Sequence, residues 1–440
     1  MAVTGTASGS DDARRAIDAV WRIESARVIA AVARLVRDIG VAEELAQDAL
    51  VAALEQWPRD GVPANPGAWL TAAAKHRAID LVRRKEVFAR KLEELGHALE
   101  ARPPESEAGF AAAEAAADDD IEDDLLRLVF TTCHPVVSTE ARVALTLRLL
   151  GGLTTAEIAR AFLVPEATVA QRIVRAKRNL AKAEVPFEQP QGTERVERLS
   201  SVLEVIYLVF NEGYSATAGD DWMRPALCED ALRLGRLLAG LMPKEPEVHG
   251  LVALMEIQAS RAAARTGPDG EPVLLIDQDR RRWDRLLIRR GFAALARSDA
   301  AGGPPGPYAL QAAIAACHAQ AARAQDTDWR RIADLYGVLA VRAPSPVVEL
   351  NRAVAVTMAY GPQEGLAVVD RLTGEPALRE YHLLPSVRGD LLERLGRHDE
   401  ARAEFLRAAE LTRNERERAL LLGRASAAGQ ARGGESGGRG

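Results

Sequence analysis

The segment from Thr154 to Leu180 constrains the fold of this 440-residue chain more than any other. Thr154 and Glu157 have the spacing of a capping box, in which each residue's side chain bonds to the other's main-chain amide, so a helix is predicted to begin there. Pro165 ends that helix, because proline lacks an amide donor and biases the residue before it away from helical geometry. A second helix is predicted over 166–181, with Pro165 in its first turn. The segment is therefore a helix-turn-helix, although its turn has Phe162-Leu-Val in place of the usual glycine.

The second helix of this motif has one apolar and one polar side. Its apolar residues recur at spacings of four, three and four, which predicts a buried stripe of Val169, Ile173, Ala176 and Leu180. The other side suits the major groove of DNA, where Gln and Arg contact base edges and further cations neutralise phosphates. The candidate DNA-binding residues are Thr168, Gln171, Arg172, Arg175, Lys177 and Arg178. The alternative interpretation is a charged helix that faces solvent.

Charge divides the chain into three parts. Residues 14–84 hold 11 basic and 9 acidic side chains, residues 85–124 hold 4 and 13, and residues 125–182 hold 9 and 3. The remainder, 183–440, is close to balanced. Two helical blocks with a positive bias thus flank an acidic segment that carries a Pro-Pro pair, and this segment is predicted to be a linker.

Composition favours an all-α fold. Hydrophobic residues make up 48% of the chain and aromatic residues only 5%, so the apolar residues are mostly Ala, Leu and Val, which pack helices side by side. Cys133, Cys228 and Cys317 lie far apart without ligand-spaced His, so we expect neither a disulfide framework nor a metal site, and no cofactor. No apolar run of about 18 residues and no signal-peptide pattern occurs, so we expect a cytoplasmic protein without a membrane span.

In the first block, helices are predicted over Arg14–Trp57 and Trp69–Arg84, separated by a loop from Pro58 to Pro66 that three prolines and a glycine break. The second helix is amphipathic, with a largely basic arc opposite its apolar face. The candidate nucleic-acid contacts of this helix are Trp69, Lys75, His76, Arg77, Asp80, Arg83 and Arg84. A solvated charged face, with the tryptophan packed on the loop, is the alternative.

The preceding helix, from Val41 to Trp57, carries an acidic and amide stripe opposite an apolar side of Leu45, Ala49 and Leu54. Carboxylates repel DNA, so this stripe is predicted to contact a protein. Its members are Glu43, Glu44, Gln47 and Asp48.

Together these pieces resemble one family, the extracytoplasmic-function-type sigma factors of bacterial RNA polymerase, in the sigma-70 family. The resemblance implies that Glu43, Glu44, Leu45, Gln47 and Asp48 bind core RNA polymerase. It also implies that 69–84 binds the minus-ten promoter element, that the loop before it captures a flipped base, and that 154–180 binds the minus-thirty-five element. His76 stands where the family commonly has Asn. The implied protein is a transcription initiation factor and not an enzyme.

The carboxy-terminal half resembles a subgroup of these sigma factors that carries a long helical-repeat extension implicated in activity control. The resemblance rests on the segments Val202–Tyr214 and Asp277–Asp284. Similar turn-plus-helix units begin at Gly361 and Gly396, 396 − 361 = 35 residues apart, which is close to the tetratricopeptide period. Such repeats offer a concave surface for a protein or peptide ligand. A purely packing or dimerising role is the alternative.

The predicted domains are a region-two domain over 14–84, the acidic linker over 85–124, a region-four domain over 125–184, a helical extension over 196–425 and a disordered tail over 427–440. One rival hypothesis is a helix-turn-helix regulator with a repeat-domain sensor that never acts as a polymerase subunit. The other is an enzyme in 196–300, whose polar residues are Asn211, Glu212, Tyr214, Asp277, Asp279 and Asp284. Because no nucleophile or phosphate loop accompanies them, helix capping is the better interpretation of these residues.

Overall fold

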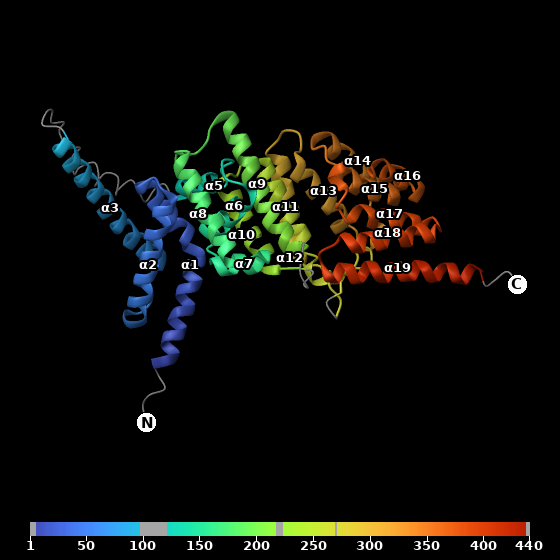
Figure 1. Cartoon of the computed structure of the whole chain (residues 1–440), viewed down its shortest axis with the longest axis horizontal. Coiled ribbons are helices and arrows are strands. Elements are labelled where there is room, and N and C mark those ends of the chain that lie inside the picture. Colours follow the sequence, from blue (N-terminus) through green and yellow to red (C-terminus); the bar gives the residue numbers. More distant parts are fainter. Residues whose placement is uncertain (1–5, 97–120, 217–222, 269–270, 437–440) are drawn as a thin grey trace, which may run out of the picture. The chain divides into compact units, whose positions relative to one another are not determined.

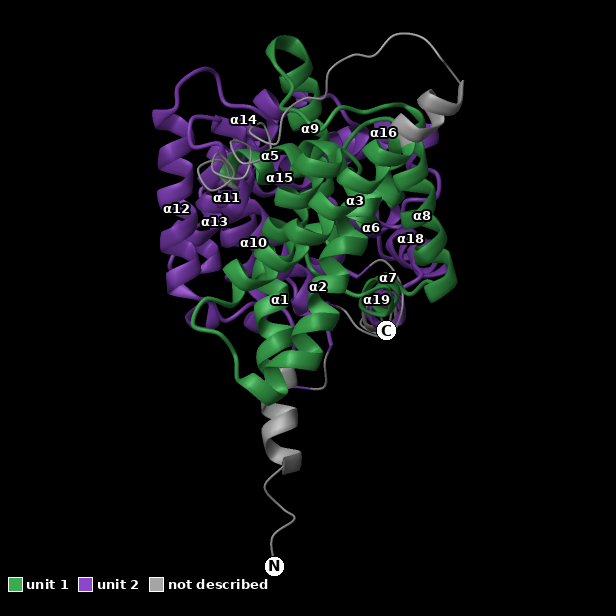
Figure 2. Cartoon of the chain, turned by 90° about the vertical axis from the view of Figure 1, so that its left-hand side faces the viewer, with its two compact units in different colours: residues 1–206 green, residues 207–440 purple. Residues whose placement is uncertain are grey.

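The computed structural model describes residues 6–96, 121–216, 223–268 and 271–436. Regular structure within these ranges is helical apart from one bridge between Thr266 and Pro272, which confirms the all-α prediction. The chain forms two compact units, residues 1–206 and 207–440 (Figure 2), and each is described by itself. None of the described helices is long and apolar enough to cross a membrane.

The first unit contains two groups of helices (Figure 1). The first group is α1 (Thr6–Val36), α2 (Ile39–Asp60) and α3 (Pro66–Gly96), and the second is α5 (Ile121–Thr132), α6 (Thr139–Leu149), α7 (Thr155–Phe162) and α8 (Glu166–Lys182). Helix α1 packs on α2 and α3 and also on α5 and α6, so it joins the two groups.

Helix α9 (Gly192–Tyr214) begins inside the first unit and continues into the second. Its first half is fixed to α5 by two side chains that reach main-chain carbonyls. The buried Arg198 guanidinium donates to the Phe130 carbonyl at 2.8 Å, and the Ser201 hydroxyl donates to the Cys133 carbonyl at 2.6 Å. Residues 192–206 are therefore part of the packing of the second helix group.

The helical stretch predicted over Arg14–Trp57 consists of two helices, because α1 ends at Val36 and α2 begins at Ile39. Arg37 has a φ of 53°, and the Asp38 carboxylate accepts hydrogen bonds from the amides of Gly40 and Val41 at 2.7 and 3.1 Å. An aspartate that satisfies free amides at a helix start favours a new helix over continuation of the old one.

The proline loop is also shorter than predicted. Helix α2 runs through Pro58 to Asp60 and ends at Gly61, whose φ of 86° lets its amide donate to the Trp57 carbonyl at 2.9 Å. Helix α3 then starts at Pro66, since proline is well tolerated at the first helical position. The loop is therefore 61–65 instead of 58–66.

Both boundaries of the predicted acidic linker need correction, because α3 extends to Gly96 and α5 begins at Ile121. The remaining residues, 97–120, lie outside the described residues. The predicted disordered tail is wrong as far as residue 436, because helix α19 (Glu415–Ser436) covers that stretch. Alanine has the highest helix propensity, and Leu421, Ala425 and Ala428 are buried at helical spacing. Residues 437–440 are outside the described ranges.

The second unit is a succession of helices that pack mainly on their neighbours in the chain. They are α10 (Pro225–Leu241), α11 (Pro246–Ala259), α12 (Arg285–Ala300), α13 (Pro307–Gln320), α14 (Trp329–Arg342), α15 (Pro346–Tyr360), α16 (Pro362–Leu372), α17 (Leu383–Arg394), α18 (His398–Leu411) and α19. Among the described residues between them lie the 3₁₀ turns η1 (Ala262–Ala264), η2 (Arg280–Arg282), η3 (Ala324–Asp326) and η4 (Pro376–Leu378).

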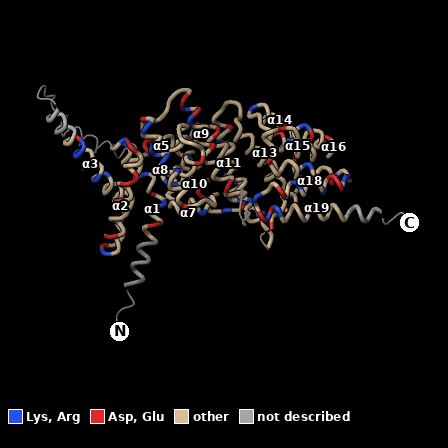
Figure 3. The backbone as a smooth tube through the Cα atoms, viewed as in Figure 1, with Lys and Arg blue, Asp and Glu red and all other residues tan. Residues whose placement is uncertain are grey.

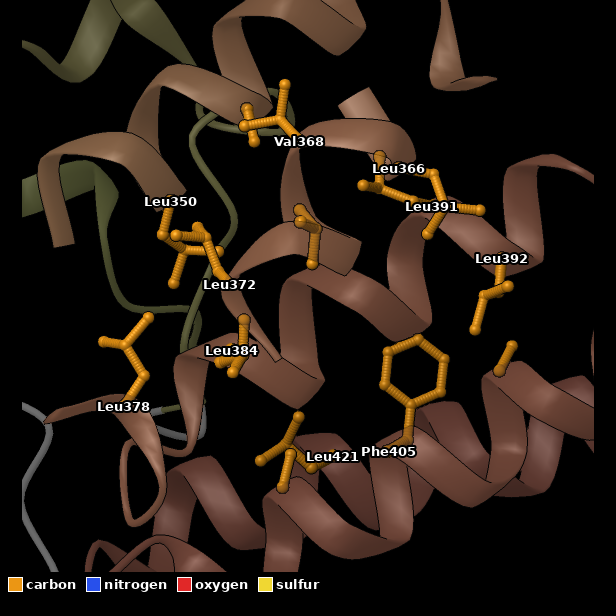
Figure 4. Close-up of a cluster of buried hydrophobic side chains, with 14 of the residues drawn as sticks. Leu350, Leu366, Val368, Leu372, Leu378, Leu384, Leu391, Leu392, Phe405 and Leu421 are labelled. Atoms are coloured by element: carbon orange, nitrogen blue, oxygen red, sulfur yellow. The ribbon is translucent and has the colours of Figure 1, made fainter. Parts of the chain in front are cut away.

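The last helices of this unit share one apolar core, shown in Figure 4. Phe405 is fully buried there, with Leu391 and Leu392 in the same cluster. Gly389 allows the ring to approach, since a Cβ at this position would lie 2.8 Å from Phe405. Gly361, with a φ of 110°, separates α15 from α16, and Gly396, with a φ of 73°, lies between α17 and α18.

Candidate nucleic-acid and protein-binding surfaces

The capping box predicted at the start of the helix-turn-helix is confirmed. The Glu157 amide donates to the Thr154 hydroxyl at 3.1 Å, and the Thr154 amide donates to the Glu157 carboxylate at 2.8 Å. Partial burial raises the pKa of the Glu157 carboxyl. The hydrogen bonds that the carboxylate accepts from Thr154 and the nearby Arg22 guanidinium have the larger, opposite effect, so the pKa is lowered overall. Helix α7 therefore starts at a fixed point of the sequence.

The turn of the motif forms without glycine. Leu163 takes a left-handed conformation with a φ of 50° and caps α7, where glycine is normally favoured. Its side chain is 55% exposed, so leucine here contributes little to the core. Pro165 then leads into α8, whose start at Glu166 agrees with the prediction.

Helix α8 has the two faces that its sequence predicted. The stripe of Val169, Ile173, Ala176 and Leu180 is buried. Of the candidate DNA contacts, Gln171, Arg175 and Arg178 are exposed, while Thr168, Arg172 and Lys177 are half-buried. No hydrogen bond or ion pair to another described residue is found for the side chains of Gln171, Arg172, Arg175 and Arg178. This face therefore presents donors and cations that lack partners within the described part of the chain.

Helix α3 buries its apolar side through Leu70, Ala74 and Ala78. On the other side His76, Asp80, Arg83 and Arg84 are exposed, and Lys75 and Arg77 are half-buried; Figure 3 marks the Lys and Arg positions of α3 in blue. The half-buried Trp69 packs edge-on against the buried Trp57, with ring centroids 5.4 Å apart. The tryptophan thus packs against the helix before the loop, and part of its ring stays accessible.

Helix α2 is oriented differently from the prediction. Its buried side is an alanine stripe with Ile39 and Trp57, whereas Leu54 is 40% exposed and Leu45 half-buried. Alanines allow α1 and α2 to approach closely, which a leucine stripe would prevent. The exposed side of α2 carries Glu44, Asp48 and Val51.

Glu43 lies apart from the exposed acidic residues, because it is only 4% exposed. Its carboxylate accepts from the Arg148 guanidinium at 2.7 Å and from the Gln47 amide at 2.6 Å. The Lys177 ammonium forms an ion pair with its second oxygen. Two residues predicted to bind different partners, Glu43 on α2 and Lys177 on α8, are thus bound to each other.

Two further salt bridges join the same helix groups. Arg22 of α1 pairs with Glu157 of α7, and Arg34 of α1 lies 3.7 Å from Asp124 of α5. These pairs could not be predicted from the sequence, because the two partners of each pair are far apart along the chain. The packing of α1–α3 on α5–α8 therefore depends on charge pairs that only the structure reveals.

Four of the six polar residues considered as an enzyme site have structural partners instead. Asp279 caps η2 by accepting from the Arg281 amide, and Asp284 caps α12 by accepting from the Leu286 and Leu287 amides. Glu212 pairs with Arg224, and the Tyr214 hydroxyl accepts from the Arg261 guanidinium at 2.6 Å. The capping interpretation is confirmed for both aspartates.

Comparison with known proteins divides the chain in the same way. The family model for sigma-70 region 2 matches residues 22–87, and that for sigma-70 region 4 matches residues 127–180. A family of unknown function, DUF6596, matches residues 198–299. The region 2 match thus falls within the helix group α1–α3, and the region 4 match within α5–α8.

Two relatives extend these matches. An uncharacterized protein of Rhizobium meliloti is 46% identical over 396 residues, which cover 90% of this chain and 92% of that protein. The ECF RNA polymerase sigma factor SigK of Mycobacterium ulcerans is 31% identical over 162 residues, which cover 35% of this chain and 78% of that protein. No solved structure matches the chain.

Proposed function

This chain belongs to the extracytoplasmic-function (ECF) sigma factors of RNA polymerase, and on that premise we propose which of its helix faces bind promoter DNA and which bind the polymerase. Sigma-70 regions 2 and 4 are non-catalytic and imply core RNA polymerase and promoter DNA as partners. The proposal assigns one partner to each exposed helix face, with α1–α3 as the region-two domain, α5–α8 as the region-four domain and 97–120 as the linker between them.

Helix α8 contacts the minus-thirty-five element. The observation that carries this assignment is the exposed face of Gln171, Arg175 and Arg178, opposite a fully buried stripe on the same helix. Arg and Gln are the side chains that pair bidentately with guanine and adenine edges in the major groove. Arg172 and Thr168 border this face, and Lys177 joins it only when its ion pair with Glu43 opens.

Helix α3 contacts the minus-ten element. Its exposed basic side, with Arg83 and Arg84 near the middle of the helix, supports phosphate contacts. Trp69 stands beside the loop at 61–65 with part of its ring accessible, where it can stack on an unpaired base.

Core RNA polymerase binds the exposed side of α2. Glu44 and Asp48 lie one helical turn apart there, with Val51 52% exposed on the next turn. Acidic side chains beside an exposed apolar one suit a partner protein whose surface carries the complementary positive charge. Leu45 supports this strip from a half-buried position.

The extension controls this activity through a repeat surface. The support is the recurrence of positive-φ glycines at Gly361 and Gly396, each before the second helix of a pair, within one continuous core. Helices α15–α18 are then two tetratricopeptide-like units, whose concave side takes a protein or peptide ligand.

Run-off transcription with purified core polymerase tests the assignment. The full chain is expected to give new promoter-specific starts, and R172A/R175A to reduce them by at least about tenfold, since each base contact is worth roughly 1–3 kcal/mol. K182A, a charge loss at the exposed end of the same helix, is the control and retains activity. Full promoter-specific activity of R172A/R175A would contradict the role of α8.

Core binding is measured separately. D48R is expected to weaken core affinity about tenfold, whereas D18R, a charge reversal at an exposed position of α1, leaves it unchanged. The extension is tested by stopping the chain after Tyr214, not before α9, because Arg198 and Ser201 belong to the packing of the region-four domain. A truncated chain with unaltered activity under all conditions would remove the regulatory role.

A further inference from the structure

A pocket in the second unit lies wholly within the residues matched to the family of unknown function. It has a volume of about 560 Å³, within the range of small-molecule sites. Helix α11 forms its floor with His249, Val252 and Glu256, which recur at spacings of three and four. Helices α10 and α12 form its walls.

The walls are basic and kept open by small residues. Arg236 lies on α10, and Arg290 and Arg297 lie seven residues apart on one face of α12. Ala239, Gly240 and Ala293 line the space between them. Within the described ranges, no acidic side chain pairs with Arg290 or Arg297, so these two cations are available to an anion.

The floor has buried acceptors without donors. Glu256 is 2% exposed; its Oε1 accepts from the Arg236 guanidinium at 2.8 Å, while its Oε2 has no hydrogen-bond partner among the described residues. His249 is 3% exposed, and its Nε2 lies 2.8 Å from the Pro243 carbonyl, so Nε2 is the donor and Nδ1 is an acceptor that no described residue satisfies.

A buried acceptor that lacks a donor costs free energy, and so does a carboxylate with only one oxygen paired. Natural proteins retain few such groups, and those that persist often face a ligand or an ordered water. Here the two buried residues that carry these acceptors, His249 and Glu256, line the same pocket as Arg290 and Arg297, which have no acidic partner among the described residues. A ligand that matches these groups has an anionic group, which binds the arginines of α12, and an N–H or O–H donor, which binds an acceptor on α11.

We infer that this pocket is a binding site for a small organic anion, a carboxylate or phosphate compound that also carries an amine or hydroxyl group. Arg290 and Arg297 hold the anionic group, and Glu256 recognises the donor. Arg236 is a positioning residue, which neutralises one oxygen of Glu256 and leaves the other for the ligand. The inference is independent of polymerase and promoter binding.

The test is thermal stabilisation of the full chain by two matched pairs of probes. L-glutamate and glutarate differ by an amine, and citrate and tricarballylate differ by a hydroxyl; inorganic phosphate is the fifth probe. A ligand that binds only the folded state stabilises it by RT ln(1 + [L]/Kd) and so raises the melting temperature as its concentration exceeds Kd. We expect at least one of glutamate, citrate and phosphate to do so below about 10 mM. We also expect glutarate and tricarballylate to bind at least about tenfold more weakly than their matched partners.

Single substitutions test whether the thermal stabilisation arises from binding in this pocket. R290Q and R297Q are each expected to weaken binding at least about tenfold, whereas R289Q, the neighbouring exposed arginine outside the pocket, leaves it unchanged. E256Q should abolish the preference for the ligand that carries the amine or hydroxyl. If E256Q fails to fold, the binding affinities of R290Q and R297Q still test the site. Stabilisation by none of the probes, or equal weakening by R289Q, would overturn the site.

Discussion

Replacing Glu43 with Gln should destabilise the packing of α2 on α6 and α8. The carboxylate is 4% exposed and is held by Arg148 and Lys177, whose side chains are 24% and 22% exposed. Removing one partner of a fully buried ion pair costs roughly 3–5 kcal/mol. Gln keeps an acceptor for Arg148, and both cations can reach water, so a loss of about 2 kcal/mol is expected.

That loss has a measurable size in a thermal melt. For a unit of about 200 residues, 1 kcal/mol shifts the midpoint by roughly 2–4 °C, so E43Q should lower the midpoint of the first unit by about 4–8 °C. E44Q is the matched control, because Glu44 is the next residue of the same helix and is exposed; its effect should stay within about 0.5 kcal/mol. The double variant E43Q/K177Q should lose less than the sum of the single variants. Equal midpoints for E43Q and E44Q would refute the buried charge cluster.

The same variant shows whether the cluster opens when the protein acts. Two DNA-binding helices must reach promoter elements about two helical turns apart, which favours separation of the helix groups. If α2 leaves α8 in the polymerase complex, a contact weakened by about 2 kcal/mol raises core affinity by up to about 30-fold. Lower stability with unchanged affinity would mean that Glu43 and Lys177 stay paired in the complex.

The helix-turn-helix could be predicted from the sequence because its determinants are local. The capping residues Thr154 and Glu157 are three positions apart, and the stripe from Val169 to Leu180 lies on one helix. The left-handed turn at Leu163 could not, since leucine pays a steric cost in that conformation and the surrounding helices impose it.

The burial of Glu43 could not be predicted, because its partner Arg148 is 105 residues away in the sequence. A glutamate within an acidic stripe is normally a surface residue, and only the two cations on α6 and α8 make its burial tolerable. The orientation of α2 could not be predicted for a related reason. Hydropathy ranks Leu54 above the alanines, but the close approach of α1 decides which side is buried. The basic pocket could not be predicted because its arginines come from two helices, and within each helix their spacing is that of ordinary surface residues.

Two further predictions concern single side chains. T154A should cost about 1 kcal/mol in a thermal melt by removing the capping box, while T154S retains the acceptor and the stability; equal midpoints for the two would contradict the cap. Burial first, and then the nearby Arg261 and Arg280 guanidinium groups, lower the pKa of His318 from 6.5 to about 3. Between these two values the unfolded chain binds one more proton than the folded chain, so stability should fall as the pH is lowered through this window. Denaturation at a series of pH values should show a shallower slope for H318Q than for the natural chain. If the slope is the same in both, His318 does not stay neutral in the folded state, and another group accounts for the acid sensitivity.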